Sequence, residues 1–359
     1  MAAIPDDVFV LDAINHAYNF SVDNRIGQPY ADGISDGVYM MHAQFTPEGH
    51  EIIDPETYNT RLADVDVTAR TMFAESHTDA CIYHELPLYG YFRDGGSPLW
   101  VGEEMRERWP GRVYIYGGIS PHQPGAIDRV DELVEEHKVS GIKLYPHDLI
   151  SGELRSFRMD DEKLLYPIFE RVQKHGLRTV AIHKAIVMGP VPMEPYFPFE
   201  VGAAARAFPD LAFEIVHGGW AFLEETVFLL QWHPNIWVST EGTTALITKA
   251  PRKFAEIIGT LMAAGAAERI LWAVGGAVVH SRLLEEAFWR FEMPRDLIEQ
   301  YGLPDITDDV KRNMLGLNAA RLLGLDLDAV TRQINADEFA KPRELAEPWS
   351  SLRHEAVAG

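Results

Sequence analysis

Short apolar runs alternate with segments in which apolar residues recur at helical spacing over most of the chain. Each run is rich in β-branched and aromatic residues, which is typical of a buried strand. Helical spacing is clear at 160–175, where Leu164, Ile168 and Val172 fall on one side. Strands that alternate with helices predict a parallel sheet, and eight of them predict a closed (β/α)8 TIM barrel. The eight runs are VFVLDA, DACIYHE, RVYIYGGIS, VSGIKLYP, LRTVAIHK, LAFEIVHGG, NIWVSTEG and RILWAVGG.

No repeat or low-complexity linker divides the 359 residues, so one barrel domain over 1–359 is predicted. Residues 27–57 are rich in Gly, Asp, Pro and Tyr and are predicted to form a loop insertion after the first strand. Residues 188–200 are too rich in proline for a helix and form a second insertion after the fifth strand. Both should lie at the active rim, as lids, oligomer contacts or irregular surface loops. Residues 325–359 are a C-terminal extension.

Composition excludes two classes of protein. A net charge of −22 argues against nucleic-acid binding, which needs a basic face. No apolar run approaches the roughly 18 residues of a membrane span. The start of the chain has no basic segment typical of a targeting signal, and the single cysteine, Cys81, fits a reducing compartment. A cytoplasmic protein is therefore expected.

Three polar side chains end three consecutive predicted strands. They are Lys143 in GIKLYP, His183 in VAIHK and His217 in EIVHGG. The ends of barrel strands meet at one rim, so these side chains should lie close together. Neutral imidazoles from adjacent strands commonly hold a catalytic transition metal, and a lysine beside them can bind substrate, act as a base or become a modified bridging ligand. A metal site is predicted.

This order of residues resembles the amidohydrolase-related metalloenzymes, the family of aminocarboxymuconate semialdehyde decarboxylase and γ-resorcylate decarboxylase. HGGW at 217–220 and the segment DDVKRNMLGLNAARLLGL at 308–325 extend the resemblance over almost the whole chain. Members usually carry Asp-x-His-x-His at strand one and Gly-Thr-Asp-x-Pro-His at strand eight. Here residues 12–16 read DAINH, with Ile14 in place of the first histidine, and 272–280 read WAVGGAVVH, without an aspartate.

Other polar groups stand at the same rim, which favours a rebuilt metal site over a decayed one. His84 and Glu85 end strand two but cannot both point inward, because strand neighbours face opposite sides. Glu241 ends strand seven, and a carboxylate beside imidazoles suits iron or manganese. His122 and His147 are predicted to lie in loops, facing solvent. STEG at 239–242 and the WAVGG motif resemble the dinuclear iron branch of the family, which includes a 2-aminoisobutyrate hydroxylase and a diterpenoid thioester hydrolase.

The resemblance assigns roles to eight residues. Lys143 could instead be carboxylated, as bridging lysines at strand four are in other amidohydrolases, or ion-paired inside the barrel. Asp12 could orient His16 and not bind metal itself. Tyr18, Tyr145 and Trp220 would wall the pocket or pack in the core. The predicted metal ligands are His16, His183, His217 and Glu241, with Asp12 and His84 as further candidates, and Lys143 and His280 are predicted to bind, bridge or position the substrate.

The activity that the resemblance implies is metal-dependent. One hypothesis is an oxygenase with two ions, iron alone or iron and manganese, that uses O2 to hydroxylate a small amino-acid-like or carboxylate substrate. A second is a zinc, manganese or iron enzyme that hydrolyses or nonoxidatively decarboxylates its substrate. A third is a non-catalytic partner of an active homologous subunit. Family members are commonly dimers or larger, so a homo-oligomer or a hetero-oligomer with a homologous chain is expected.

Overall fold

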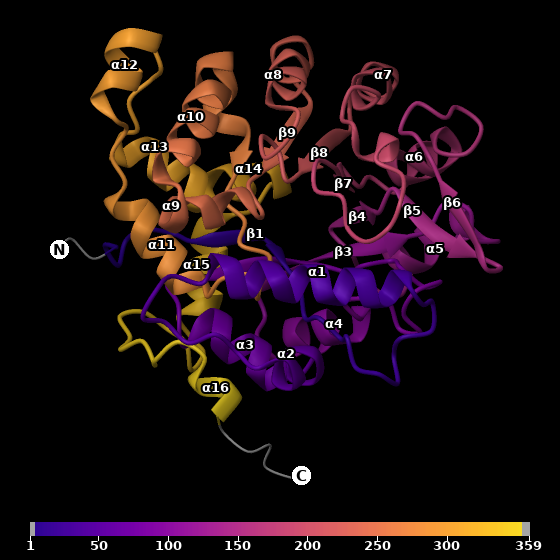
Figure 1. The fold of residues 1–359 in the computed structure, drawn as a ribbon, viewed down its shortest axis with the longest axis horizontal. Helices are drawn as coiled ribbons and strands as arrows, with labels where there is room; N and C mark the ends of the chain where they lie inside the picture. The colour runs from indigo at the N-terminus through magenta and orange to yellow at the C-terminus, as the bar shows by residue number, and fades with distance from the viewer. Residues whose placement is uncertain (1–3, 354–359) are drawn as a thin grey trace.

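Eight parallel strands form the centre of the molecule (Figure 1). The computed structural model describes residues 4–353. The first and last strands are also joined: the Ala13 amide donates to the Trp272 carbonyl at 2.8 Å, and the Gly275 amide donates to the Ile14 carbonyl at 2.9 Å. The ring therefore closes, and the predicted (β/α)8 barrel is confirmed. Its strands, in spatial order, are β1 Leu11–Asn15, β2 Ala80–His84, β3 Val113–Ile119, β4 Gly141–Leu144, β7 Thr179–His183, β8 Ala212–Val216, β9 Ile236–Ser239 and β10 Ile270–Leu271.

Helices surround the barrel, and a short hairpin that the sequence did not reveal follows β4. The hairpin pairs β5 (His147–Ile150) with β6 (Glu153–Ser156) in antiparallel register. The helices are α1 Tyr30–Phe45, α2 Pro55–Arg61, α3 Val65–Phe73, α4 Leu99–Arg108, α5 Ala126–Glu135, α6 Tyr166–Lys174, α7 Val201–Ala207, α8 Leu223–Trp232, α9 Leu246–Lys249, α10 Pro251–Leu261, α11 Ser281–Arg290, α12 Arg295–Tyr301, α13 Asp308–Arg312, α14 Asn318–Leu323, α15 Leu327–Ile334 and α16 Ser350–Arg353.

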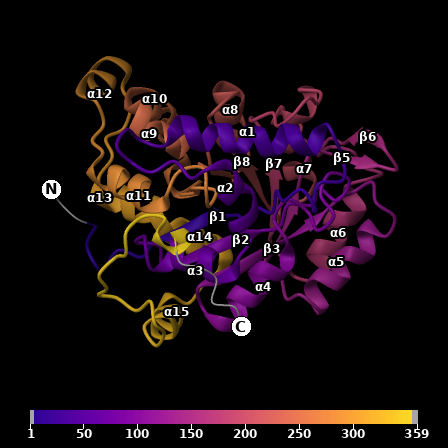
Figure 2. The same ribbon diagram turned by 60° about the horizontal axis from the view of Figure 1, so that its bottom comes forward.

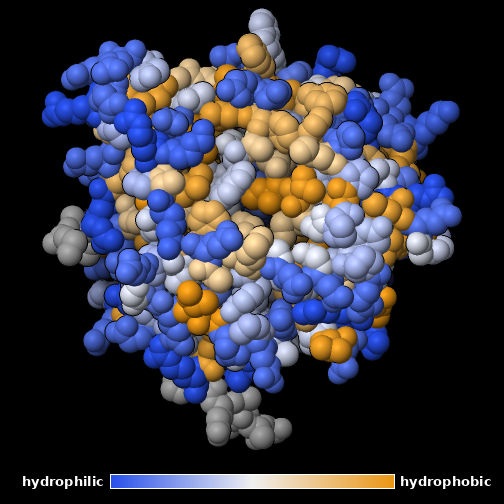
Figure 3. Space-filling model, viewed as in Figure 1, coloured by the Kyte–Doolittle hydropathy of each residue, from blue (hydrophilic) through white to orange (hydrophobic). Residues whose placement is uncertain are grey.

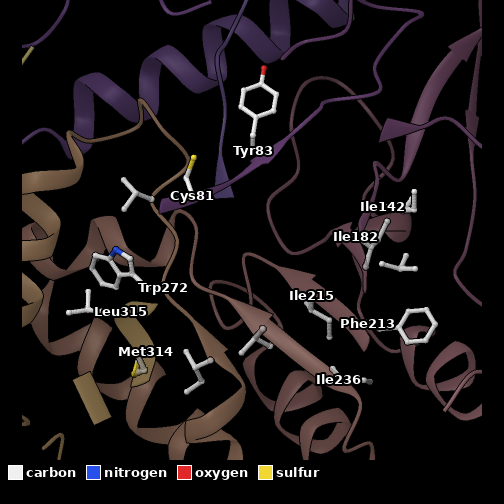
Figure 4. Packing of buried hydrophobic residues seen from close by; sticks show 14 of the residues in the cluster. Cys81, Tyr83, Ile142, Ile182, Phe213, Ile215, Ile236, Trp272, Met314 and Leu315 are labelled. Carbon is white, nitrogen blue, oxygen red and sulfur yellow. The ribbon is translucent and has the colours of Figure 1, made fainter. Parts of the chain in front are cut away.

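The two-residue period of the strands divides their side chains into two layers. One set, including Ile182, Ile215 and Trp272, packs under the helices in the main hydrophobic core (Figure 4). The alternate set, including Ala181 and Val216, fills the inside of the barrel. Each large apolar side chain removed from water contributes about 1.5–3 kcal/mol, so the register of the strands is strongly determined.

The insertion at 27–57 is not the irregular loop that its composition suggested. Residues 30–45 form α1, the long indigo helix of Figure 1. Ile34, Val38 and Met41 lie at helical spacing on one side of it and line the pocket described below. Two of its glycines serve close packing: a Cβ on Gly33 would lie 2.8 Å from Pro190, and one on Gly37 would lie 3.3 Å from Met188. Glycine content therefore misled the prediction, because here it marks a contact surface.

The second insertion, 188–200, is irregular as predicted, apart from a single 3-10 turn, Glu194–Tyr196. Met188 lines the same pocket as α1, so both insertions lie at the rim where the strands end. The predicted position of the two insertions is thus confirmed. Their mutual packing is a feature that the sequence did not indicate.

The C-terminal extension returns to the amino-terminal half of the barrel (Figures 1 and 2). Its last helix, α16, lies beside α3, where the Ser351 and Thr71 hydroxyls are hydrogen-bonded at 2.9 Å. Residues 354–359 of the extension lie outside the described residues. Within 4–353, no helix combines the length and the apolar character needed to cross a bilayer.

Candidate active site

The carboxyl ends of the strands bring four of the predicted ligands together. His183 ends β7 and His217 directly follows β8, and their facing nitrogens, Nδ1 and Nε2, are 3.1 Å apart. Glu241 follows β9, and its two carboxylate oxygens lie 3.6 Å from Nε2 of His16 and 3.6 Å from Nε2 of His217. All four residues line one pocket. His217 takes the left-handed backbone conformation, with φ of 64°, which is uncommon outside glycine and clusters at functional sites.

Glu241 occupies room that the end of β10 leaves free. Gly275 stands at the inward position two residues beyond Ala273. At this position a side chain from the end of β10, the eighth strand of the barrel, would enter the site. A Cβ on Gly275 would lie 2.4 Å from Glu241 Oε1 and 2.9 Å from its Cγ. A side chain at 275 and the observed position of Glu241 therefore exclude each other. Glu241 can take its observed position only because residue 275 has no side chain.

Backbone carbonyls determine which nitrogen of each imidazole carries the proton. His16 Nδ1 lies 2.9 Å from the His84 carbonyl, His217 Nδ1 lies 2.9 Å from the Glu241 carbonyl, and His183 Nε2 lies 2.6 Å from the Ile186 carbonyl. A carbonyl only accepts, so each of these nitrogens must donate. In a neutral ring the other nitrogen then has a lone pair and no hydrogen. A backbone acceptor behind each ring is the usual support for a metal-binding histidine.

The three rings are held neutral. Burial holds the pKa of His217 down at about 3 and the pKa values of His16 and His183 well below their usual range. The lone pairs of His183 and His217 therefore face each other, and those of His16 and His217 face Glu241, whose pKa burial raises to about 7. Such a set of acceptors calls for a cation, so the chemistry of the donors fits a transition metal. Within 4–353, however, no three His, Cys, Asp or Glu side chains are already gathered around one point as a metal-holding cluster.

Lys143 lies inside the barrel and does not line the pocket. Its side chain is fully buried, and Nζ has no hydrogen-bond partner among the described residues. Burial lowers its pKa, while Glu241 and Glu214 act in the opposite sense. Its predicted contact with the substrate is therefore not seen, and neither is a close ion pair. When protonated, Lys143 would lower the pKa values of the three imidazoles further, after the larger effect of burial.

The two further ligand candidates have different surroundings. His84 points into the barrel and packs on Tyr116, with ring centroids 4.7 Å apart, and neither ring nitrogen has a partner among the described residues. As expected, Glu85 faces away, where Arg129 pairs with it at 3.6 Å. Asp12 neither faces the ligands nor orients His16. Its Oδ1 accepts from the Val274 amide at 3.0 Å, so it fastens the first strand to the last.

His280 is not in the pocket, contrary to the prediction. It is buried at the start of α11, where Nδ1 accepts from the Arg282 amide at 3.3 Å and Nε2 donates to Glu75 at 3.0 Å. Glu75 also accepts from the Trp349 amide at 2.7 Å and the Ser351 amide at 2.6 Å. The pair therefore anchors the C-terminal segment. The segment 275–279 still borders the pocket through Val278, and only His280 lies beyond it, which strand spacing could not reveal.

Replacing Glu75 with glutamine should loosen this anchor without affecting the pocket. Burial opposes ionisation of Glu75, but the bonds from His280 and Ser351 hold its pKa below the usual 4.5. Its charge therefore stabilises the fold above about pH 4.5, and this contribution is lost as the pH falls through the lowered pKa. Urea denaturation at pH 7 should show Glu75→Gln less stable by about 1–3 kcal/mol, with the difference shrinking below pH 4.5. The exposed Glu344→Gln is the control; equal stability of both variants would contradict the anchor.

Tyrosines and one histidine form a hydrogen-bonded chain beside the site that the sequence did not reveal. Tyr145 lines the pocket, packs on His183 in a tilted arrangement with ring centroids 4.3 Å apart, and is hydrogen-bonded to Tyr196. His147 was predicted to face solvent, but it is buried between the Tyr196 and Tyr91 hydroxyls. The Tyr91 hydroxyl lies 2.7 Å from its Nδ1. The hairpin β5–β6 and the second insertion bring these residues together. Their distance along the chain left no local signal.

The wall residues are only partly as predicted. Tyr18 and Tyr145 line the pocket, whereas Trp220 packs on Phe45, with ring centroids 5.5 Å apart. His122 is partly exposed, in line with the predicted solvent-facing position, and its Nε2 donates to the Ser156 carbonyl at 3.0 Å.

Comparisons with known proteins agree on the fold. An uncharacterised TIM-barrel protein of Bordetella bronchiseptica is 17% identical, with 88% of this chain and 98% of that one covered and a TM-score of 0.62. The 5-carboxyvanillate decarboxylase of Sphingomonas paucimobilis is 16% identical, with 89% and 100% covered and a TM-score of 0.54. A dihydroxybenzoic acid decarboxylase of Polaromonas sp. JS666, solved with manganese and 2-nitroresorcinol, is 12% identical, with 89% and 97% covered and a TM-score of 0.55.

Sequence comparison gives the family. No curated protein matches the chain. The family model described as Amidohydrolase matches residues 39–325, most of the sequence, and begins after the altered first strand. The chain belongs to the amidohydrolase family.

Proposed function

We propose that this chain is a metal-dependent enzyme that hydrolyses an acyl substrate. The observation that carries the proposal is the set of ligand-type side chains in one pocket: Nε2 of His217 lies 3.1 Å from Nδ1 of His183, and the Glu241 carboxyl oxygens lie 3.6 Å from Nε2 of His16 and of His217. Membership of the amidohydrolase family supports it. So does the manganese in the Polaromonas decarboxylase of similar fold.

Four side chains that line the pocket could serve as ligands. His16, His183, His217 and Glu241 would hold the ion, and the carboxylate would balance part of its charge. A bound divalent ion would supply Lewis-acid polarisation of a carbonyl and a more acidic water at neutral pH. Lys143, buried behind the histidines, would keep the rings unprotonated and so available as ligands.

The remaining chemistry would come from the chain of tyrosines. Tyr145 faces the pocket, and its hydrogen bond to Tyr196 connects it to His147. Burial lowers the pKa of His147 to about 4, so the ring is neutral and has one donor and one acceptor. A proton given by Tyr145 to a leaving group could thus be replaced along the chain. The apolar walls would exclude other water from the reaction.

An iron oxygenase is the second candidate, favoured by one observation. The strand-eight aspartate is absent, and a glutamate from the neighbouring strand fills its place, so the site is three histidines and one glutamate. Imidazole and carboxylate ligands with open positions suit iron that reacts with O2. A small amino-acid-like or carboxylate substrate remains the prediction for that activity. Decarboxylation stays a further alternative, because two of the similar structures are decarboxylases.

Metal analysis combined with three assays separates these candidates. The purified chain should contain at least one transition-metal ion, and removal by chelation should abolish hydrolysis of 4-nitrophenyl hexanoate until Zn²⁺, Mn²⁺ or Fe²⁺ is restored. Release of CO2 from hydroxybenzoates and uptake of O2 are measured on the same samples. Hydrolysis that persists without metal would refute the proposal. About two irons per chain with substrate-dependent O2 uptake would replace it with the oxygenase.

A further inference from the structure

Apart from two tyrosines, the pocket above the histidines and Glu241 is lined by apolar side chains and one glycine. The space inside it is about 510 Å³ when its open mouth is counted, and about 40 Å³ of this is open to the centre of a water molecule. Figure 3 shows hydrophobic residues gathered around a hollow near the centre of this face. Beyond the four ligand candidates, Gly242 and two tyrosines, the lining consists of Phe20, Ile34, Val38, Met41, Leu86, Leu88, Ile186, Met188 and Val278.

One apolar side of the pocket, here called the apolar wall, comes from two separate segments that pack against each other. Ile34, Val38 and Met41 come from α1, and Ile186 and Met188 follow β7. The two segments pack closely at Gly189, where an added Cβ would lie 3.7 Å from Cγ1 of Ile34. Met188, Ile34 and Val38 belong to one buried cluster. The wall is therefore a packed surface with a defined shape.

The pocket lining has no cationic side chain that could pair with an anionic group on the substrate. Among the residues that line it, none is Lys or Arg. Lys143 is enclosed in the barrel, and Lys184, the next residue after His183, is buried against Glu200. An anionic group placed among the apolar side chains would lose its hydration without compensation. All polar chemistry is thus confined to one end of the pocket.

We propose that the substrate is an uncharged, largely apolar molecule with a single polar reacting group. The apolar body would lie along α1 and the segment after β7, and the reacting group would face the histidines and Glu241. This assignment is an alternative to the small amino-acid-like or carboxylate substrate that the family resemblance implies. It rests on the proposed function only for the identity of the group that reacts.

Binding of neutral amides tests the assignment without requiring turnover. Burial of one methylene contributes about 0.8 kcal/mol, which corresponds to about a 4-fold gain in affinity. Isothermal titration calorimetry should therefore show affinity rising about 4-fold per methylene from butanamide to octanamide. Glutarate and 4-aminobutyrate should bind more weakly than octanamide. A flat series, or tighter binding of the charged compounds, would overturn the proposal.

Two adjacent methionines of α1 provide a matched pair of variants. Met41 lines the pocket, whereas Met40 is 53% exposed. Met41→Glu should abolish the dependence on chain length, and Met40→Glu should leave it unchanged. Met41→Ala, which adds no charge, should weaken octanamide binding about 4-fold or more and covers the case in which Met41→Glu fails to fold. Equal behaviour of Met40→Glu and Met41→Ala would count against the apolar wall.

The outcomes separate this assignment from the proposed function. Amide binding that follows chain length in a protein without hydrolase activity would refute the proposed reaction and keep the substrate class. Suppose instead that hydrolysis depends on metal but that 4-nitrophenyl acetate and 4-nitrophenyl octanoate are cleaved equally well. That result would keep the proposed reaction and refute the apolar substrate class.

Discussion

Replacing His217 with alanine should reduce the bound metal to near zero and lower activity by more than about 100-fold. Loss of groups that merely support a ligand costs about 10–100-fold in metal affinity, and His217 is itself placed among the acceptors, 3.1 Å from His183 and 3.6 Å from Glu241. The measurement is metal content by mass spectrometry, together with hydrolysis at saturating metal. Circular dichroism confirms that the variant is folded.

A second histidine serves as the control for this experiment. His233, at the end of α8, is partly exposed and far from the pocket lining. His233→Ala should retain both metal and activity. Full metal content in His217→Ala would refute the site, whereas loss of metal in both variants would point to general destabilisation.

Replacing Gly275 with alanine should displace Glu241 and lower activity about 100-fold. The new Cβ would lie 2.4 Å from Oε1 and 3.0 Å from Cδ of Glu241, closer than nonbonded carbon atoms approach. Gly275 also has φ of 81°, so alanine would add about 1–2 kcal/mol of backbone strain. Activity and thermal unfolding are measured on the same preparation.

Gly265→Ala is the control that separates the clash of the new Cβ with Glu241 from the strain of alanine at positive φ. Its φ of 76° is almost the same, but a Cβ there would meet no atom within 4 Å. Gly265→Ala should therefore lose similar stability and keep its activity. Equal activity of the two alanine variants would mean that Glu241 does not need its observed position.

The sequence was sufficient for the barrel and for the inward side chains of its strands. Buried parallel strands are continuous apolar runs, and their period of two places Lys143, His183 and Glu241 on the inside once the strands are known. The missing aspartate of strand eight was equally visible. These features depend on residues adjacent along the chain, which is the range over which sequence patterns are informative.

Other features depended on contacts between distant segments. The room for Glu241 is set by Gly275 on the next strand, and the lone pairs of the imidazoles are set by backbone carbonyls such as that of Ile186. His280 was assigned to the site by its place after strand eight, but its partner is Glu75. α1 was mistaken for a loop because packing contacts and turn formation both favour glycine.

Thus the sequence by itself determined the fold, the rim and the types of side chain available for chemistry. Only the tertiary structure decided which of them meet, which nitrogen of each ring is free, and that the pocket above them is apolar. The reason is physical: strand and helix periodicity is local, whereas the direction of a lone pair and the shape of a pocket are set by atoms from several elements at once.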